Sequence, residues 1–170
     1  TPTGRKVTGS RIVECIAHDN STAPTGHQPG FQMLGQVDNC IVEYCISYRN
    51  GSGIELRERD AVNVFRDYSI IEWREPWPDA ARDCIVRNCI AYDNRKSDEN
   101  SDGIGGRYIT NCLYENNASY GNVDDNFDSI ASVACNWIGN IAFDSNPEGT
   151  VDGDGNGIKT STREGGGNLI

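Results

Sequence analysis

The sequence predicts an all-β fold, a parallel β-helix of about six coils in which residues 1–170 form one domain. A segment of ten residues recurs along the chain, its apolar residues fall in short alternating runs, and Asn, Gly and Asp bound those runs. Five copies align directly, at 11–20, 41–50, 85–94, 113–122 and 136–145. We expect a degenerate sixth copy, Phe65–Arg74, to fill the interval between the second and third copies.

The spacing of the copies separates a β-helix from other repeat folds. One column runs through Ala17, Ser47, Ile71, Ala91, Ser119 and Ala142, with successive steps of 30, 24, 20, 28 and 23 residues. Coils of three short strands with turns of variable length fit such steps, whereas propeller blades are longer and helical repeats show a 3.6-residue apolar period. Residues 165–170 read as the start of another repeat, so we expect the chain to be an excerpt of a longer solenoid.

The aligned copies also predict which side chains stack on one another. The seven cysteines are interpreted as small buried residues of a stacked core rather than as disulfides. They form two columns, Cys40, Cys84, Cys112 and Cys135 in one and Cys15, Cys45 and Cys89 in the other. His18 aligns with Tyr48, Tyr92, Tyr120 and Phe143, which favours a stacked ring over a metal ligand. A structural ladder is expected from Asn20, Asn50, Asn94 and Asn122.

The composition restricts the class of partner. The net charge is -10 and the pI is near 4.6, which argues against nucleic acid and anionic membranes as partners. No apolar run approaches the length of a membrane span. A polyanionic substrate would therefore need a bridging cation or a local basic groove.

Acidic residues converge where the third strand of successive coils begins. Gly103-Ile104-Gly105, Asn126-Phe127-Asp128 and Gly157-Ile158-Lys159 align, and their middle residue is apolar, so the residues on either side of it face outward. This register brings together four carboxylates, those of Asp102, Asp124, Asp125 and Asp128. Carboxylates this close repel one another unless a cation neutralises them, and Ca²⁺ is the hard cation that accepts several carboxylate oxygens.

Lys159 is the lysine that we expect on this face, one coil beyond the aspartates. A lysine beside a divalent cation on a partly dry wall can act as a Brønsted base, and the simpler alternative is a salt bridge to Asp128. The segment 152–157 matches the first half of an EF-hand loop, but the twelfth position would be Arg163 where a Glu is required, so we reject an EF-hand.

These motifs resemble polysaccharide lyase family nine, the calcium-dependent pectate lyases and their relatives. The resemblance rests on Ser101-Asp-Gly-Ile-Gly105, Val123-Asp-Asp-Asn-Phe-Asp-Ser129 and Gly153-Asp-Gly-Asn-Gly-Ile-Lys159, in this order and at similar spacing. It implies a right-handed parallel β-helix and a secreted or cell-surface enzyme. It also implies a Ca²⁺ site at Asp102, Asp124, Asp125 and Asp128 and a catalytic base at Lys159. Arg107 and Arg163 are expected to bind the substrate because they lie close to these residues in sequence.

The chemistry implied by the resemblance is β-elimination on an acidic polysaccharide, a polyuronate such as pectate. The chain departs from the family at Ile104, Asn126 and Ile158, which replace Phe, Gly and Phe, and it ends soon after the lysine. The alternative from another class is a non-catalytic β-solenoid, such as an adhesin or a filament protein whose coil ends stack into fibres. A β-helix hydrolase or epimerase is a third possibility, but it needs paired acid and base carboxylates rather than a metal-like cluster.

Overall fold

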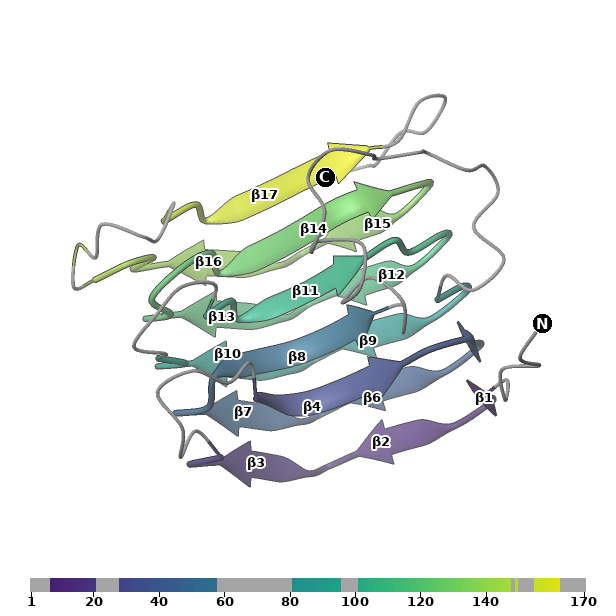
Figure 1. The fold of residues 1–170 in the computed structure, drawn as a ribbon, viewed down its shortest axis with the longest axis horizontal. Helices are drawn as coiled ribbons and strands as arrows, with labels where there is room; N and C mark the ends of the chain where they lie inside the picture. Colours follow the sequence, from purple (N-terminus) through teal and green to yellow (C-terminus); the bar gives the residue numbers. More distant parts are fainter. Residues whose placement is uncertain are drawn as a thin grey trace, which may run out of the picture.

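The computed structural model describes residues 7–20, 28–57, 81–95, 101–147, 149 and 155–162. These residues wind into a right-handed parallel β-helix with a wall of three parallel five-stranded sheets, which confirms the predicted fold class (Figure 1). Each coil contributes one strand to each sheet, so the described residues form five coils stacked along one axis. No helix of the described ranges is long and apolar enough to cross a membrane.

The strands are short, and neighbours in one sheet pair with their sequence repeats in register. The first sheet contains β2 (Arg11–Val13), β6 (Ile41–Glu43), β9 (Ile85–Arg87), β12 (Leu113–Glu115) and β15 (Asn136–Ile138). The second contains β3 (Ile16–His18), β7 (Ile46–Tyr48), β10 (Ile90–Tyr92), β13 (Ala118–Tyr120) and β16 (Ile141–Phe143). The third contains β4 (Pro29–Leu34), β8 (Ser52–Arg57), β11 (Ile104–Arg107), β14 (Phe127–Ser132) and β17 (Ile158–Thr162). β1 (Val7–Thr8) and β5 (Val37–Asp38) form a separate parallel pair.

The corners between sheets depend on residues with positive φ. The corner between the first and second sheets uses one such residue in every coil, namely Glu14, Tyr44, Asn88, Asn116 and Gly139, with φ between 53° and 65°. A single left-handed residue reverses the alternation of side chains and turns the chain between two short strands. Asn88, Asn116 and Gly139 are of the residue types that adopt this conformation at least cost, whereas Glu14 and Tyr44 adopt it at a higher cost.

The core is a stack of like residues in consecutive coils. On the first sheet Val42, Val86, Tyr114 and Trp137 face inward, and the rings of Tyr114 and Trp137 stack with centroids 3.9 Å apart. All seven cysteines are free thiols, and six of them are buried, which confirms the predicted core columns. Cys15 on the first coil is the exception, because it is exposed.

The predicted aromatic and asparagine ladders are confirmed on the second sheet and at its corner. His18, Tyr48, Tyr92, Tyr120 and Phe143 stack with centroids 4.6–5.1 Å apart and nearly parallel rings. In the asparagine column, Asn50 N–H donates to Asn94 Oδ1 at 3.2 Å, and Asn94 N–H and Nδ2 both donate to Asn122 Oδ1. These ladders join consecutive coils and satisfy buried backbone donors.

The second and third repeats pair with each other directly. β6 pairs with β9, β7 with β10 and β8 with β11, and Ser47 is the partner of Ala91. A sixth coil therefore does not separate them, and the expected position of Ile71 between Ser47 and Ala91 is wrong. The segment Phe65–Arg74 itself lies outside the described residues.

Candidate metal centre and its charged surroundings

The third sheet carries a row of polar residues that changes from coil to coil. Ile54, Ile104 and Phe127 point into the core, so the residue after each of them faces outward. The register of β4, β8, β11, β14 and β17 places five outward positions in one row, namely Gln32, Glu55, Gly105, Asp128 and Lys159. Adjacent positions lie about 4.8 Å apart along the axis. Unlike the ladders of the second sheet, this row brings acidic and basic groups into contact.

Three aspartates meet at the corner where β11 and β14 begin. One carboxylate oxygen each from Asp102, Asp124 and Asp125 lies within 4.8 Å of the other two. All three residues are at most 5% exposed. Backbone and side-chain N–H groups of Asn156 donate to Asp125 Oδ1 at 2.8 and 3.0 Å, and this fixes the Asp125 carboxylate. The structure thus brings together three of the four residues predicted to bind a metal.

Asp128 is the fourth predicted ligand, and it lies beside this group on β14. Burial raises the pKa of Asp128 to about 6, against the opposing influence of Arg107 and Lys159. Burial and the negative charge of Asp128 raise the pKa of Asp102 well above its ordinary value. Both shifts show that this part of the molecule disfavours further negative charge, which a proton or a cation would offset.

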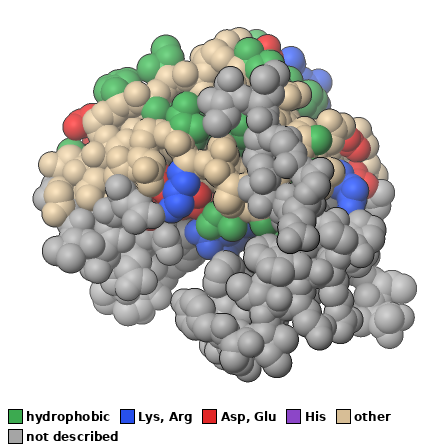
Figure 2. All heavy atoms as spheres, turned by 90° about the horizontal axis from the view of Figure 1, so that it is seen from above, with side chains coloured by type: hydrophobic (Ala, Val, Ile, Leu, Met, Phe, Trp, Pro, Cys, Tyr) green, Lys and Arg blue, Asp and Glu red, His purple; other side chains and the backbone are tan. Residues whose placement is uncertain are grey.

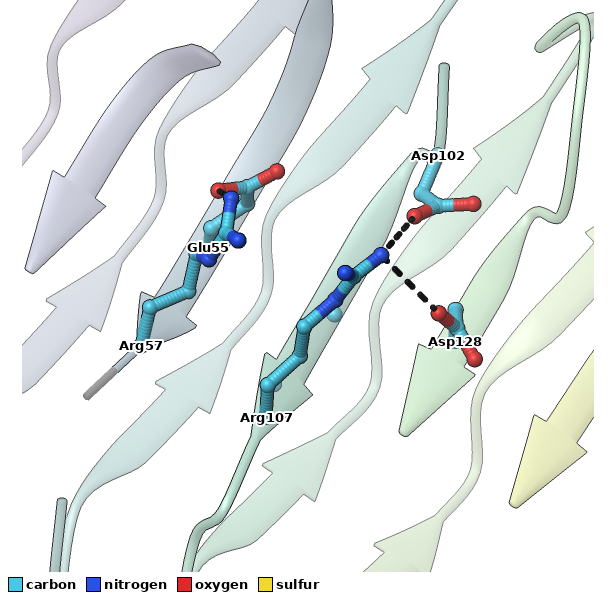
Figure 3. Close-up of a pocket in the computed structure, with 7 residues that line it drawn as sticks. Glu55, Arg57, Asp102, Arg107 and Asp128 are labelled. Carbon is cyan, nitrogen blue, oxygen red and sulfur yellow. Dashed lines mark ion pairs between the residues drawn. The ribbon is translucent and has the colours of Figure 1, made fainter. Parts of the chain in front are cut away.

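Two cationic side chains flank the aspartates on opposite sides. Arg107 Nη2 lies 3.9 Å from Asp102 Oδ2 and 3.8 Å from Asp128 Oδ2 (Figure 3). Lys159 Nζ lies 3.1 Å from Asp125 Oδ2, and the lysine side chain is 37% exposed. The backbone partner of Lys159 is Asp128, yet the ion pair goes to Asp125 on the preceding corner.

The geometry and donor set fit a hard divalent cation. Oxygens that share one Ca²⁺ at about 2.4 Å lie no more than about 4.8 Å apart, and the three grouped donors are carboxylate oxygens. Asp128 Oδ1 is buried and receives no hydrogen bond from the described residues, so it is a further acceptor. Around this group five carboxylates face three cationic side chains, which leaves two negative charges: Glu55, Asp102, Asp124, Asp125 and Asp128 against Arg57, Arg107 and Lys159.

The sequence reasoning missed two charged residues of this region, Glu55 and Arg57. They lie on β8, are 6% and 8% exposed, and line a hollow together with Asp102, Gly105, Gly106, Arg107 and Asp128 (Figure 3). The signal was available, because Glu55 belongs to the same aligned column as Asp128 and Lys159. Figure 2 shows the molecule from above the view of Figure 1, with basic and acidic side-chain atoms side by side within a mostly uncharged surface.

Two other predictions on this region fall outside the described residues. Arg163 and residues 152–154 of the rejected EF-hand segment belong to those ranges. Arg107, in contrast, has the position near the carboxylates that its place in the sequence predicts.

Comparisons with protein-family models, curated proteins and solved structures found no match to this chain.

Proposed function

We propose that this protein is a polysaccharide lyase that cleaves a polyuronate such as pectate by β-elimination, with Ca²⁺ as its cofactor and a secreted or cell-surface location. The observation that carries the proposal is the buried aspartate group with Lys159 at its exposed edge. Three carboxylate oxygens within 4.8 Å of one another repel each other and destabilise the fold when no cation is bound. The β-helix does not need such a group in order to fold. The group fits a metal-binding role better than a structural one.

Among the described residues beside the aspartates, Lys159 is a group that can move the proton. Lys159 is half-exposed on β17, and its Nζ is held by Asp125 Oδ2 at 3.1 Å. In the proposed reaction this amine takes the proton from C5 of a uronate residue, the electron pair forms the C4–C5 double bond, and the glycosidic oxygen leaves from C4. An ammonium paired with a carboxylate holds its proton, so the base role requires that the charge of Asp125 be offset.

The aspartates would hold the cation. Asp102, Asp124, Asp125 and Asp128 are the residues that would ligate it, and a bound Ca²⁺ would polarise the uronate carboxylate and acidify the C5 proton. Arg107 binds and orients the acidic substrate from the neighbouring strand, because its guanidinium group already lies against the same carboxylates. Arg163 is proposed for the same role from its place in the sequence.

The test is the ultraviolet absorbance of the unsaturated product on polygalacturonate. We expect product formation with Ca²⁺, none with a chelator, and a fall of about 10²- to 10⁴-fold for Lys159→Ala. Arg49→Ala is the matched control, since Arg49 is an exposed cation that pairs with Asp19 at the end of the second sheet, away from the aspartates. A folded chain that gives no product on pectate or alginate would contradict the proposal.

The second candidate is a non-catalytic β-solenoid of the adhesin or filament type. The repeated ladders of asparagine, aromatic and cysteine residues favour it, because they stabilise a stack of coils without any need for chemistry. Self-stacking into fibres belongs to this candidate and is tested by the concentration dependence of the sedimentation coefficient. Ca²⁺ binding without any eliminated product, together with assembly, would favour it over the lyase.

A further inference from the structure

Two arginines lie side by side in the hollow next to the aspartate group. Arg57 on β8 and Arg107 on β11 are direct partners in the parallel pairing, so their backbones are about 4.8 Å apart. Their side chains are 10% and 13% exposed, and both line the hollow (Figure 3). Two buried guanidinium groups on adjacent coils repel each other unless anionic groups lie between them or beside them.

The contacts of Arg57 are weak for a buried guanidinium group. Its Nη1 lies 3.5 Å from Glu55 Oε2, beyond the 2.7–2.9 Å of a charge-assisted hydrogen bond. Its Nε is buried and has no hydrogen-bond partner among the described residues. A buried donor without an acceptor is costly, and a planar fork of donors is suited to a carboxylate. The hollow therefore has donor capacity that its own acids do not use.

The row of side chains is interrupted at this point. Gly105 stands in the row between Glu55 and Asp128 and has no side chain, so no outward group separates these two acidic residues. A Cβ added at Gly105 would lie 2.6 Å from the backbone oxygen of Asp128, so a larger residue would not fit without a backbone shift. Because Gly105 and Gly106 both line the hollow, no side chain from these two positions covers the two arginines.

The charge of the hollow depends on the aspartate group. Glu55, Asp102 and Asp128 oppose Arg57 and Arg107, and this balance is negative. A Ca²⁺ ion shared by the four aspartates would offset the two excess negative charges of the five carboxylates and three cationic side chains of this region. The region would then be neutral and would no longer repel an anion that approaches the two arginines.

We propose that Arg57 and Arg107 form a second carboxylate subsite, which binds the uronate residue next to the one at the aspartate group. The proposal rests on the proposed function and deepens it, because it defines the substrate. A pyranose residue is similar in length to the spacing between coils, so consecutive carboxylates of a chain along the axis would reach consecutive coils. The ligand is a run of at least two uronates with free carboxylates, and a methyl ester at the second position removes the charge that the arginines recognise.

The test compares the affinity of arginine variants for oligouronates in a chain that lacks the proposed base and therefore does not cleave the ligand. In the Lys159→Ala background with Ca²⁺, trigalacturonate and monogalacturonate are titrated by calorimetry against Arg57→Gln, Arg57→Lys and the distant control Arg49→Ala. We expect Arg57→Gln to weaken trimer binding roughly ten- to hundredfold, Arg57→Lys to weaken it less, and monomer binding to stay unchanged. Glu55→Gln should have the opposite sign and tighten trimer binding, which a merely structural role for Arg57 would not produce.

Three outcomes decide the matter. Equal trimer affinity in Arg57→Gln and Arg49→Ala overturns the subsite, and so does an equal loss for monomer and trimer. Absence of trimer binding by the Lys159→Ala chain with its arginines intact also overturns it. Failure of the proposed function gives a different result from failure of the subsite. If only the lyase activity is wrong, the chain with Lys159 intact forms no unsaturated product, but trimer binding still depends on Arg57. Circular dichroism of each variant checks that the β-helix is intact.

Discussion

The second and third sheets use the same coil geometry in opposite ways. On the second sheet each coil repeats the residue of the previous one, so that rings lie on rings and asparagines on asparagines. On the third sheet the outward row runs Gln32, Glu55, Gly105, Asp128 and Lys159, and no two neighbours are alike. Repetition stabilises the stack, whereas the irregular row contains the unfavourable charges. In this solenoid the candidate site lies where a column stops repeating.

The largest effect on stability should come from the irregular row. The pKa of Asp128 is raised from 3.8 to about 6. Without divalent cations, this carboxyl group therefore destabilises the fold increasingly as the pH rises from about 4, and the destabilisation is complete above about pH 6. We expect Asp128→Asn to raise the free energy of unfolding at pH 7.5 in chelator by on the order of 1–3 kcal/mol and to reduce the stabilisation by Ca²⁺. Urea denaturation with and without Ca²⁺ measures both. A less stable Asp128→Asn in chelator would contradict the strain assigned to this row.

The repeated column should respond in the opposite direction. Asn94 is fully buried, accepts from Asn50 N–H and donates to Asn122 Oδ1. Asn94→Ala leaves buried groups without partners and should lower the free energy of unfolding by about 1–3 kcal/mol, whether or not Ca²⁺ is present. Arg95→Ala, next to it but half-exposed, should change this free energy by less than about 0.5 kcal/mol. A similar loss in both variants would show that the ladder contributes no specific stability.

A smaller loss is expected from the aromatic ladder. Tyr92 lies between Tyr48 and Tyr120, with ring centroids at 4.9 and 5.1 Å. Tyr92→Leu keeps an apolar side chain but removes two stacked contacts, so the free energy of unfolding should fall by about 0.5–1.5 kcal/mol. Near-ultraviolet circular dichroism should report the lost stacking. If Tyr92→Leu lowered the free energy of unfolding more than Asn94→Ala does, the aromatic ladder would contribute more to stability than the asparagine ladder, contrary to this prediction.

The first sheet offers a comparison of pH dependence. Glu43 is buried between Arg11 and Arg87, and hydrogen bonds from these two arginines lower the pKa of its carboxyl below 4.5. The stability from this group is present above pH 4.5 and is lost as the pH falls through the lowered pKa, the opposite sign to Asp128. Glu43→Gln should therefore weaken the fold at pH 7 and matter less at pH 3. Equal losses at both pH values, measured by urea denaturation, would contradict the ionic origin.

The repeats made the fold predictable, and they also predicted part of the site. Identical residues at Cys, Asn and aromatic positions aligned the coils, and the alignment placed Asp102, Asp125 and Asp128 on neighbouring coils. Glu55 lies in the column of Asp128 and Lys159, and Arg57 lies in the column of Arg107, but the burial of these two charged side chains was not predictable from the alignment. The partner of Lys159 was not predictable either, because it depends on the reach of a side chain rather than on register. The direct pairing of the second and third coils was missed because weak similarity in Phe65–Arg74 was read as a repeat.

The pairing of β8, β11, β14 and the first three residues of β17 is in register, so the outward positions of this face have a fixed spacing along the axis. Charged groups on it can be moved along the axis only in steps of one coil, about 4.8 Å, because an intermediate displacement would break the ladder of backbone hydrogen bonds. Under the proposed function, the preference of this face for one polymer over another would change only in whole-coil steps. It would depend on which coil bears which charge and not on gradual adjustment of a loop. Exchanging the polar residues of one coil for those of the next would change the spacing of the charges along the axis, while the backbone of the β-helix would stay the same.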